Sequence, residues 1–301
     1  MAPLSKNMTS LPPDSAYREA PPAPARARPV LRMRQNILAA IEDMVVDEVP
    51  IALVYNGISH AVMMATPAHL EEFALGFSLS EGIIAQPGEC YDIEAEQGPD
   101  GITMHLEIAS SAFMGLKERR RTLAGRTGCG LCGVDSLQQV CRALPTLAPA
   151  RGFHARAVGV ALAAIGAEQD LTRLTGAAHA AAWCGMDGGM RLVREDVGRH
   201  NALDKVIGAM ARARARPEDG FLLLTSRVSF EMAQKAIMAR VPALVGMSAP
   251  TLAAIELAEQ AGMTLLAFAR GRDFVCYTHP QHLDLGQHPV ALSGLQPLRR
   301  A

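Results

Sequence analysis

Two cysteines set among glycines, Cys129 and Cys132, are the residues of this chain best suited to covalent chemistry. A thiolate is the reactive form of cysteine, and cationic neighbours or a helix N-terminus raise its population. A basic segment, Arg119–Arg126, lies just upstream, and a helix is predicted to start near Asp135. The surrounding glycines permit an exposed loop. The segment therefore has the features expected of a loop that transfers a sulfur-bound group from one partner to another.

Zinc chemistry fits this Cys-x-x-Cys pair less well. A structural zinc site needs two more ligands, no second Cys-x-x-Cys pair exists, and His279 and His282 are distant in sequence. Zinc deaminases carry His-x-Glu followed by Pro-Cys-x-x-Cys. His105 and Glu107 do precede the pair, but Thr127-Gly128 stands where the proline should be. We therefore expect no resident metal.

Three other interpretations use the same residues. The glycines at 128, 130 and 133 formally spell the dinucleotide-binding G-x-G-x-x-G, but they follow a basic segment and not a strand. Dithiol exchange of the thioredoxin type remains open, although the tryptophan before the pair and the proline within it are missing. A purely structural role for the two thiols also remains open.

Composition limits the class of protein. The chain has 301 residues, of which 49% are hydrophobic and 20% charged, enough for one large domain or two modest ones. Its net charge of −1 and its aromatic content of 4% argue against a nucleic-acid partner. Six cysteines in a chain of this length do not make a disulfide scaffold, and no signal peptide or membrane span is recognisable. We expect a reducing, cytoplasmic location.

The first half of the chain indicates an α+β domain. Residues 1–33 are rich in proline, alanine and arginine and are expected to form a disordered tail. Residues 51–64 are two apolar runs around Asn56-Gly57, which is a strong hairpin signal. A helix is expected after Thr66-Pro67, and residues 101–108 alternate as a half-buried strand does. Together these features predict an N-terminal α+β domain over residues 34–148.

The second half, residues 149–286, alternates strands with helices and predicts a mostly parallel or mixed sheet, followed by a tail at 287–301. Polar segments follow three predicted strands, at residues 225–229, 248–251 and 270–273. Their convergence at the strand carboxyl ends suggests a ligand that carries phosphate. The charged run 194–205 is interpreted as a solvated helix face with His200/Asp204 and Asn201/Lys205 pairs. His179 is interpreted as a structural histidine.

Six segments, taken together, resemble the formate dehydrogenase accessory sulfurtransferase family (FdhD type). They are GCGLCGVDSL (128–137), TGAAHAAA (175–182), REDVGRHNALDKVIG (194–208), TSRVSFEMAQKA (225–236), SAPTLAAIELAEQAGMTLLAF (248–268) and RGRDFVCYTHP (270–280). The resemblance covers roughly residues 35 to 285 and shows no departure at the cysteine pair.

This resemblance implies an α/β protein whose C-terminal domain has a cytidine-deaminase-like mixed sheet with helices on both faces. It also implies a smaller α+β N-terminal domain and a homodimer. Members of the family accept a persulfide sulfur from a cysteine desulfurase. They pass it to bis-molybdopterin guanine dinucleotide, the cofactor of formate dehydrogenase. The expected partners are therefore a cysteine desulfurase and formate dehydrogenase.

The resemblance also assigns residues. Cys129 would carry the persulfide, with Cys132 as its assistant or relay, and the guanine-dinucleotide contact would fall on Phe268, Ala269, Arg270, Gly271, Arg272 and Asp273. The anion-binding argument adds Ser226 and Arg227, with phosphates on the arginines and helix N-termini. Two alternatives stay open: a non-catalytic cofactor-binding chaperone for formate dehydrogenase, and a dithiol oxidoreductase without nucleotide affinity.

Overall fold

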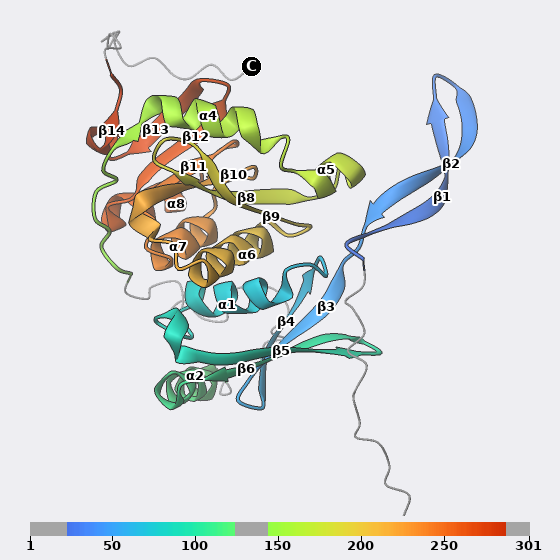
Figure 1. Cartoon of the computed structure of the whole chain (residues 1–301), viewed down its shortest axis with the longest axis horizontal. Coiled ribbons are helices and arrows are strands. Elements are labelled where there is room, and N and C mark those ends of the chain that lie inside the picture. Colours follow the sequence, from blue (N-terminus) through green and yellow to red (C-terminus); the bar gives the residue numbers. More distant parts are fainter. Residues whose placement is uncertain (1–22, 124–143, 287–301) are drawn as a thin grey trace, which may run out of the picture.

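The computed structural model describes residues 23–123 and 144–286, which form two stacked units and a projecting hairpin (Figure 1). The N-terminal unit contains a four-stranded sheet in the order β4-β3-β6-β5. Its elements are β3 (Val49–Tyr55), β4 (Ile58–Ala65), α1 (Leu70–Ser80), the short helix η1 (Pro87–Glu89), β5 (Cys90–Gly98), β6 (Gly101–Ile108) and α2 (Ser110–Leu123).

The local predictions for this unit are confirmed. Asn56 and Gly57 both have positive φ, 45° and 80°, as the tight turn of a two-residue hairpin requires. In β6 the alternate residues Ile102, Met104 and Leu106 are buried. Helix α1 covers this face of the sheet with its aromatic side chains and so closes the first hydrophobic core.

The C-terminal unit contains a six-stranded mixed sheet in the order β13-β12-β11-β10-β8-β9. β10, β11 and β12 are parallel neighbours, whereas the pairs β12/β13, β10/β8 and β8/β9 are antiparallel. The strands are β8 (His179–Gly185), β9 (Met190–Asp196), β10 (Gly220–Leu224), β11 (Ala243–Gly246), β12 (Thr264–Arg270) and β13 (Asp273–Thr278), and β7 (Phe153–His154) pairs separately with β14 (Leu283–Asp284).

Helices cover both faces of this sheet, as predicted. Along β10, Leu222 and Leu224 point to one core and Phe221 and Leu223 to the other. The first core is closed by α6 (Arg199–Arg212), α7 (Phe230–Met238) and α8 (Leu252–Ala261), the second by α4 (Ala155–Ile165). The specific likeness to cytidine deaminases stays a prediction. The remaining elements are α5 (Asp170–Thr175), η2 (Pro217–Asp219) and η3 (Pro280–His282).

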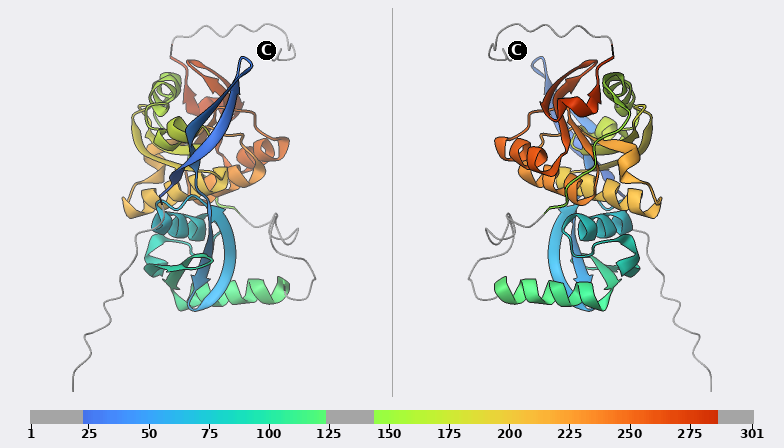
Figure 2. Two further views of the ribbon diagram at one scale, coloured as in Figure 1. Left: turned by 90° about the vertical axis from the view of Figure 1, so that its right-hand side faces the viewer. Right: turned by 90° about the vertical axis from the view of Figure 1, so that its left-hand side faces the viewer.

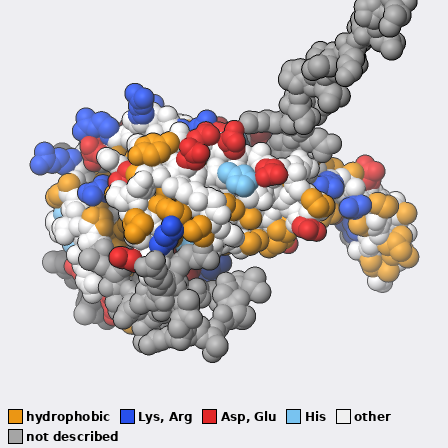
Figure 3. All heavy atoms as spheres, turned by 90° about the horizontal axis from the view of Figure 1, so that it is seen from below, with side chains coloured by type: hydrophobic (Ala, Val, Ile, Leu, Met, Phe, Trp, Pro, Cys, Tyr) orange, Lys and Arg blue, Asp and Glu red, His pale blue; other side chains and the backbone are white. Residues whose placement is uncertain are grey.

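The expectation of a disordered tail over residues 1–33 is wrong for its last nine residues. β1 (Ala25–Arg34) pairs with β2 (Ile37–Val46) in a ten-residue antiparallel register. Proline is tolerated within β1, at Pro29, because a two-stranded ribbon leaves the outer side of each strand unpaired. The hairpin projects from the body and exposes apolar side chains such as Leu31 and Ile37 (Figure 3). Residues 1–22 and 287–301 lie outside the described ranges.

The two units meet where α1 packs on α6 (Figure 2). The approach is close because both helices carry a glycine at the crossing. A Cβ atom on Gly76 would lie 1.7 Å from the Asp204 carbonyl oxygen, and one on Gly208 would lie 1.8 Å from the Glu72 carbonyl oxygen. Backbone therefore meets backbone at this junction. Within the described ranges, no helix combines the length and the apolar character that a membrane span requires.

Candidate functional site

Loops from five strands meet at one edge of the six-stranded sheet. β10, β11 and β12 are parallel and end there. β8 is antiparallel to β10, so its first residue, His179, lies at this edge, and β9 ends there at Asp196. The helices α6, α7 and α8 begin in the loops that follow β9, β10 and β11. Their N-terminal N–H groups therefore point toward this edge and favour an anionic ligand. We call it the carboxyl edge: His179, residues 196–199, 225–229 and 248–251, and Phe268.

Backbone hydrogen bonds join neighbouring loops of the carboxyl edge. Met247 N donates to Leu224 O at 2.9 Å, which ties the loop after β11 to β10. Phe268 N donates to Ser248 O at 3.2 Å, which ties β12 to the same loop. The predicted polar segments 225–229 and 248–251 are therefore side by side, and Phe268 is next to them.

The predicted contact segment 268–273 forms the β12 end of the site. Phe268 has a φ of 52°, a left-handed conformation that is uncommon for a bulky residue, and the pairing of β12 with β13 is irregular there. Ala269 is buried, whereas Arg270, Gly271, Arg272 and Asp273 are exposed. A Cβ atom on Gly159 of α4 would lie 3.2 Å from the Gly271 carbonyl oxygen, so this turn rests against α4.

Three arginines of the predicted site are available to a ligand. The side chains of Arg227, Arg270 and Arg272 are exposed, and none forms an ion pair with a described residue. Ser226 is buried, and its hydroxyl donates to the Arg227 carbonyl oxygen at 3.1 Å. Unpaired guanidinium groups suit phosphate oxygens, and Arg227 also lies just before the N-terminus of α7.

Cys129 and Cys132 lie outside the described residues, as does Arg126, and the side chains of Arg119–Arg121 are not described either. The chain enters this segment from α2 of the N-terminal unit, which ends at Leu123. It leaves the segment at Leu144, which packs against the core of the C-terminal unit. The cysteine pair thus lies on the chain that joins the two units.

The thiols of the described residues are poor nucleophiles. Burial raises the pKa of the Cys90 thiol to about 11 and that of Cys184 to about 12. Burial also raises the pKa of Cys276. These three thiols stay protonated at neutral pH, and protonated thiols react slowly. Within residues 23–123 and 144–286, no group of three or more His, Cys, Asp and Glu side chains is placed to bind a metal ion.

Comparison with known proteins identifies the family. The model of the FdhD/NarQ family matches residues 46–284. The chain belongs to the FdhD/NarQ family. Similar relatives named "Sulfur carrier protein FdhD" occur in Variovorax paradoxus, 52% identical over 87% of this chain and 95% of the relative, and in Cupriavidus necator, 52% identical over 88% and 91%.

A solved structure shows that another protein shares this fold. The crystal structure of a putative formate dehydrogenase accessory protein from Desulfotalea psychrophila matches with a TM-score of 0.69 and 21% sequence identity. The match covers 86% of this chain and 99% of that one. At this identity the likeness concerns the fold alone. The resemblance to the FdhD type predicted from the six segments is confirmed by the family match.

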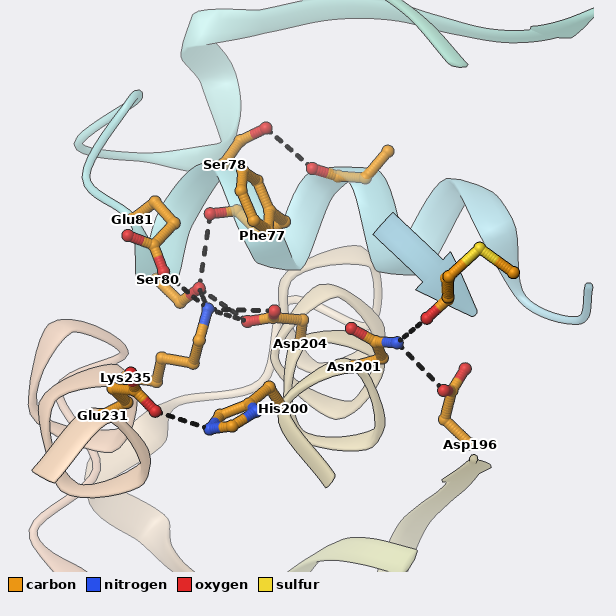
Figure 4. A network of polar contacts seen from close by, with 12 residues as sticks. Phe77, Ser78, Ser80, Glu81, Asp196, His200, Asn201, Asp204, Glu231 and Lys235 are labelled. Atoms are coloured by element: carbon orange, nitrogen blue, oxygen red, sulfur yellow. Dashed lines mark hydrogen bonds and ion pairs between the residues drawn. The ribbon is translucent and has the colours of Figure 1, made fainter. Parts of the chain in front are cut away.

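The interpretation of residues 194–205 as a solvated helix face is wrong. Asn201, Asp204 and Lys205 are 3%, 1% and 0% exposed. They do not form the expected pairs along the helix. Asn201 and Asp204 instead reach other elements (Figure 4), and Lys205 pairs with Asp196 at the end of β9. The physical reason is that α6 is covered on both sides, by the sheet and by α1, so its charged residues must find partners across the junction.

One half of this buried network is centred on Asp196, at the end of β9. Its Oδ2 accepts hydrogen bonds from Lys205 Nζ at 2.6 Å and from Thr66 N at 3.0 Å. Its Oδ1 accepts from Gly198 N at 2.8 Å and from Asn201 Nδ2 at 3.0 Å. Both carboxylate oxygens are thus occupied, and the turn from β9 into α6 is held in one conformation.

The other half joins α1, α6 and α7 through Asp204 (Figure 4). Lys235 Nζ lies 3.0 Å from both Asp204 carboxylate oxygens and 2.8 Å from Glu81 Oε1. Ser80 Oγ donates to Asp204 Oδ1 at 2.6 Å. Full burial raises the pKa of Asp204 to about 6, against the opposing effect of Lys235. Nearer the carboxyl edge, His200 on α6 contacts Glu231 on α7 at 2.8 Å.

This network was not predicted from the sequence, although one signal was available. The charged residues of 199–212 alternate with apolar residues such as Leu203, Val206 and Ile207, which are all buried. Apolar residues on more than one face of a helix indicate burial on more than one side. Charged residues in such a helix need partners from outside it.

Proposed function

We propose that this chain is a sulfur carrier that serves formate dehydrogenase. Cys129 accepts a persulfide sulfur from a cysteine desulfurase and passes it to bis-molybdopterin guanine dinucleotide, with Cys132 as assistant or relay. The observation that carries the proposal is the 52% identity, over nearly their whole length, with relatives named as sulfur carriers. The Cys-Gly-Leu-Cys segment supplies the thiol chemistry that such a carrier needs.

The loading step is a thiol exchange. The Cys129 thiolate attacks the outer sulfur of the desulfurase persulfide. A new bond forms between Cys129 Sγ and that sulfur, while the sulfur–sulfur bond of the donor breaks. The donor cysteine leaves as a thiolate, so no net oxidation or reduction takes place. The basic segment 119–126 favours the attacking anion.

The sulfur acceptor is a substrate of this carrier, and the carboxyl edge is where we propose it binds. Its guanine dinucleotide part carries phosphates. The edge offers helix N-termini and the exposed side chain of Arg227, and the turn from β12 to β13 adds the exposed side chains of Arg270 and Arg272. Residues 268–273 would contact the nucleotide end. The proposal includes a reducing cytoplasmic location and a homodimer, as the family resemblance implies.

Intact-mass analysis tests the sulfur-carrier role. Incubation with a cysteine desulfurase and cysteine should add about 32 Da, one sulfur atom, to the wild type, on a peptide that contains Cys129. Cys129→Ala should abolish this gain. Cys276→Ala is the matched control and should load normally, because burial keeps its thiol protonated.

Three results would count against this role. Unchanged transfer of radiolabelled sulfur by Cys129→Ala would remove Cys129 from the mechanism. A wild type that never gains sulfur but still binds guanosine diphosphate would favour the cofactor chaperone instead. A reversible Cys129–Cys132 disulfide without nucleotide binding would favour the dithiol oxidoreductase.

A further inference from the structure

A positively charged side chain with an unused donor lies at the β9 end of the carboxyl edge. Arg199 is the first residue of α6, directly after the N-cap Gly198. Its Nε atom is buried and has no hydrogen-bond partner among the described residues. An unsatisfied buried donor costs free energy, so its place in a folded protein calls for an explanation, and a bound ligand is one.

The neighbours of Arg199 also suit an anion. His179 lies close enough for the Arg199 charge, after burial, to help lower the pKa of its imidazole. Ser229 occupies the N-cap position of α7, but its side chain accepts no hydrogen bond from the first turn of that helix. Its hydroxyl is buried without a partner among the described residues. Thr251, in the same position on α8, does cap its helix. The uncapped ends of α6 and α7 are adjacent, because His200 contacts Glu231 across them (Figure 4).

The position of Arg199 is fixed by the buried network. Asp196 accepts hydrogen bonds from Gly198 N and from Asn201 Nδ2, on either side of Arg199. Lys205 and Thr66 occupy its second oxygen. The turn that presents Arg199 is therefore rigid before any ligand binds, which lowers the entropy cost of binding.

We propose that Arg199, with His179 and Ser229, forms a second anion-binding subsite of the carboxyl edge, which takes phosphate oxygens of the nucleotide ligand. This inference rests on the proposed function, because the ligand is the guanine dinucleotide part of the sulfur acceptor. β12 and β8 are three strand spacings apart, about 14 Å. An extended nucleoside diphosphate spans such a distance, with its base near Phe268 on β12 and its terminal phosphate near His179 on β8, where the Arg199 charge also acts.

Calorimetry with guanosine diphosphate and guanosine monophosphate tests the subsite in the full-length protein. Arg199→Gln should weaken the binding of the diphosphate by about tenfold to a hundredfold, the value of one lost charge-assisted contact. The binding of the monophosphate should change less than threefold, because the terminal phosphate is absent. Arg199→Lys should weaken the binding of the diphosphate less than Arg199→Gln does, since it keeps the positive charge.

The matched control is Arg191→Gln. Arg191 lies at the opposite end of β9, where it pairs with Asp187, and its loss should leave both affinities unchanged. If Arg199→Gln weakened the binding of both nucleotides equally, or did not weaken the binding of the diphosphate, the subsite proposal alone would be overturned. Failure of the wild type to bind either nucleotide would overturn the proposed nucleotide site together with it.

Discussion

Two lysine side chains are buried at the junction of α1, α6 and α7, although lysine is almost never fully buried unless it is paired. Lys205 is wholly buried and Lys235 is 5% exposed, and each is paired with a buried aspartate. A buried ion pair adds little net stability over apolar residues of the same volume, because both charges lose their hydration. Removing one partner is different, since the remaining charge is left without compensation.

Lys235→Met should therefore lower the free energy of unfolding by about 3–5 kcal/mol, as removal of one partner of a buried pair does. Urea denaturation measures this loss. Arg173→Met is the matched control: its ion pair with Asp170 is mostly exposed, and its loss should cost less than about 1 kcal/mol. A Lys235→Met protein within about 1 kcal/mol of the wild type would show that Asp204 is protonated or hydrated in the folded state.

At the scale of elements, the α1–α6 crossing depends on glycine. Gly76 and Gly208 let the two helix backbones touch, and a Cβ atom at either position would overlap a carbonyl oxygen of the other helix. The clash is with backbone and not with the end of a flexible side chain. It can be relieved only by moving one helix away from the other.

Gly208→Ala should accordingly destabilise the protein by about 1–3 kcal/mol or more, although alanine is the better helix former. Thermal or urea unfolding measures the change. Gly115→Ala on α2 is the control, because a Cβ atom there meets nothing within 4 Å. That substitution should be neutral or stabilise by about 0.5–1 kcal/mol. Stabilisation by Gly208→Ala as well would mean that the backbones of α1 and α6 do not touch at the crossing.

In the protein as a whole, the two units are joined by a junction that combines close apolar packing with specific charged pairs. Helix α1 belongs to the N-terminal sheet, yet Leu79 near its end also packs against the core of the C-terminal sheet. The Asp204–Lys235–Glu81 cluster adds charged contacts across the same junction. Separating the units would expose these charges and the glycine faces together, so the units should unfold together.

Trp183, the one tryptophan of the chain, lies in β8 and reports on the C-terminal unit alone. Its fluorescence and the far-ultraviolet circular dichroism of the whole protein should follow the same transition in urea, which is the behaviour of a single cooperative unit. A dichroism change that precedes the fluorescence change would show that the N-terminal sheet unfolds first and that the junction is weaker than its contacts suggest.

Much of this architecture was predictable because it is locally encoded. The Asn56-Gly57 turn, the alternation of β6 and the polar loops after β10 and β11 depend on residues within a few positions of one another. The extent of β1 was not predictable, because prolines and arginines carry little strand signal by themselves. Its ten residues become a strand through pairing with β2.

Six separate segments of the chain are enough to identify the family, and the glycine-flanked Cys129 and Cys132 mark the candidate site of thiol chemistry. The roles of residues 194–205, in contrast, depend on how the chain folds. Asp204 accepts hydrogen bonds from Ser80 and Lys235, which are 124 and 31 residues away in the sequence, and no local pattern encodes such partners. Charged residues whose pattern resembles a solvated surface are in fact buried against α1. Asp196, through its hydrogen bond from Gly198 N, holds the turn that positions Arg199.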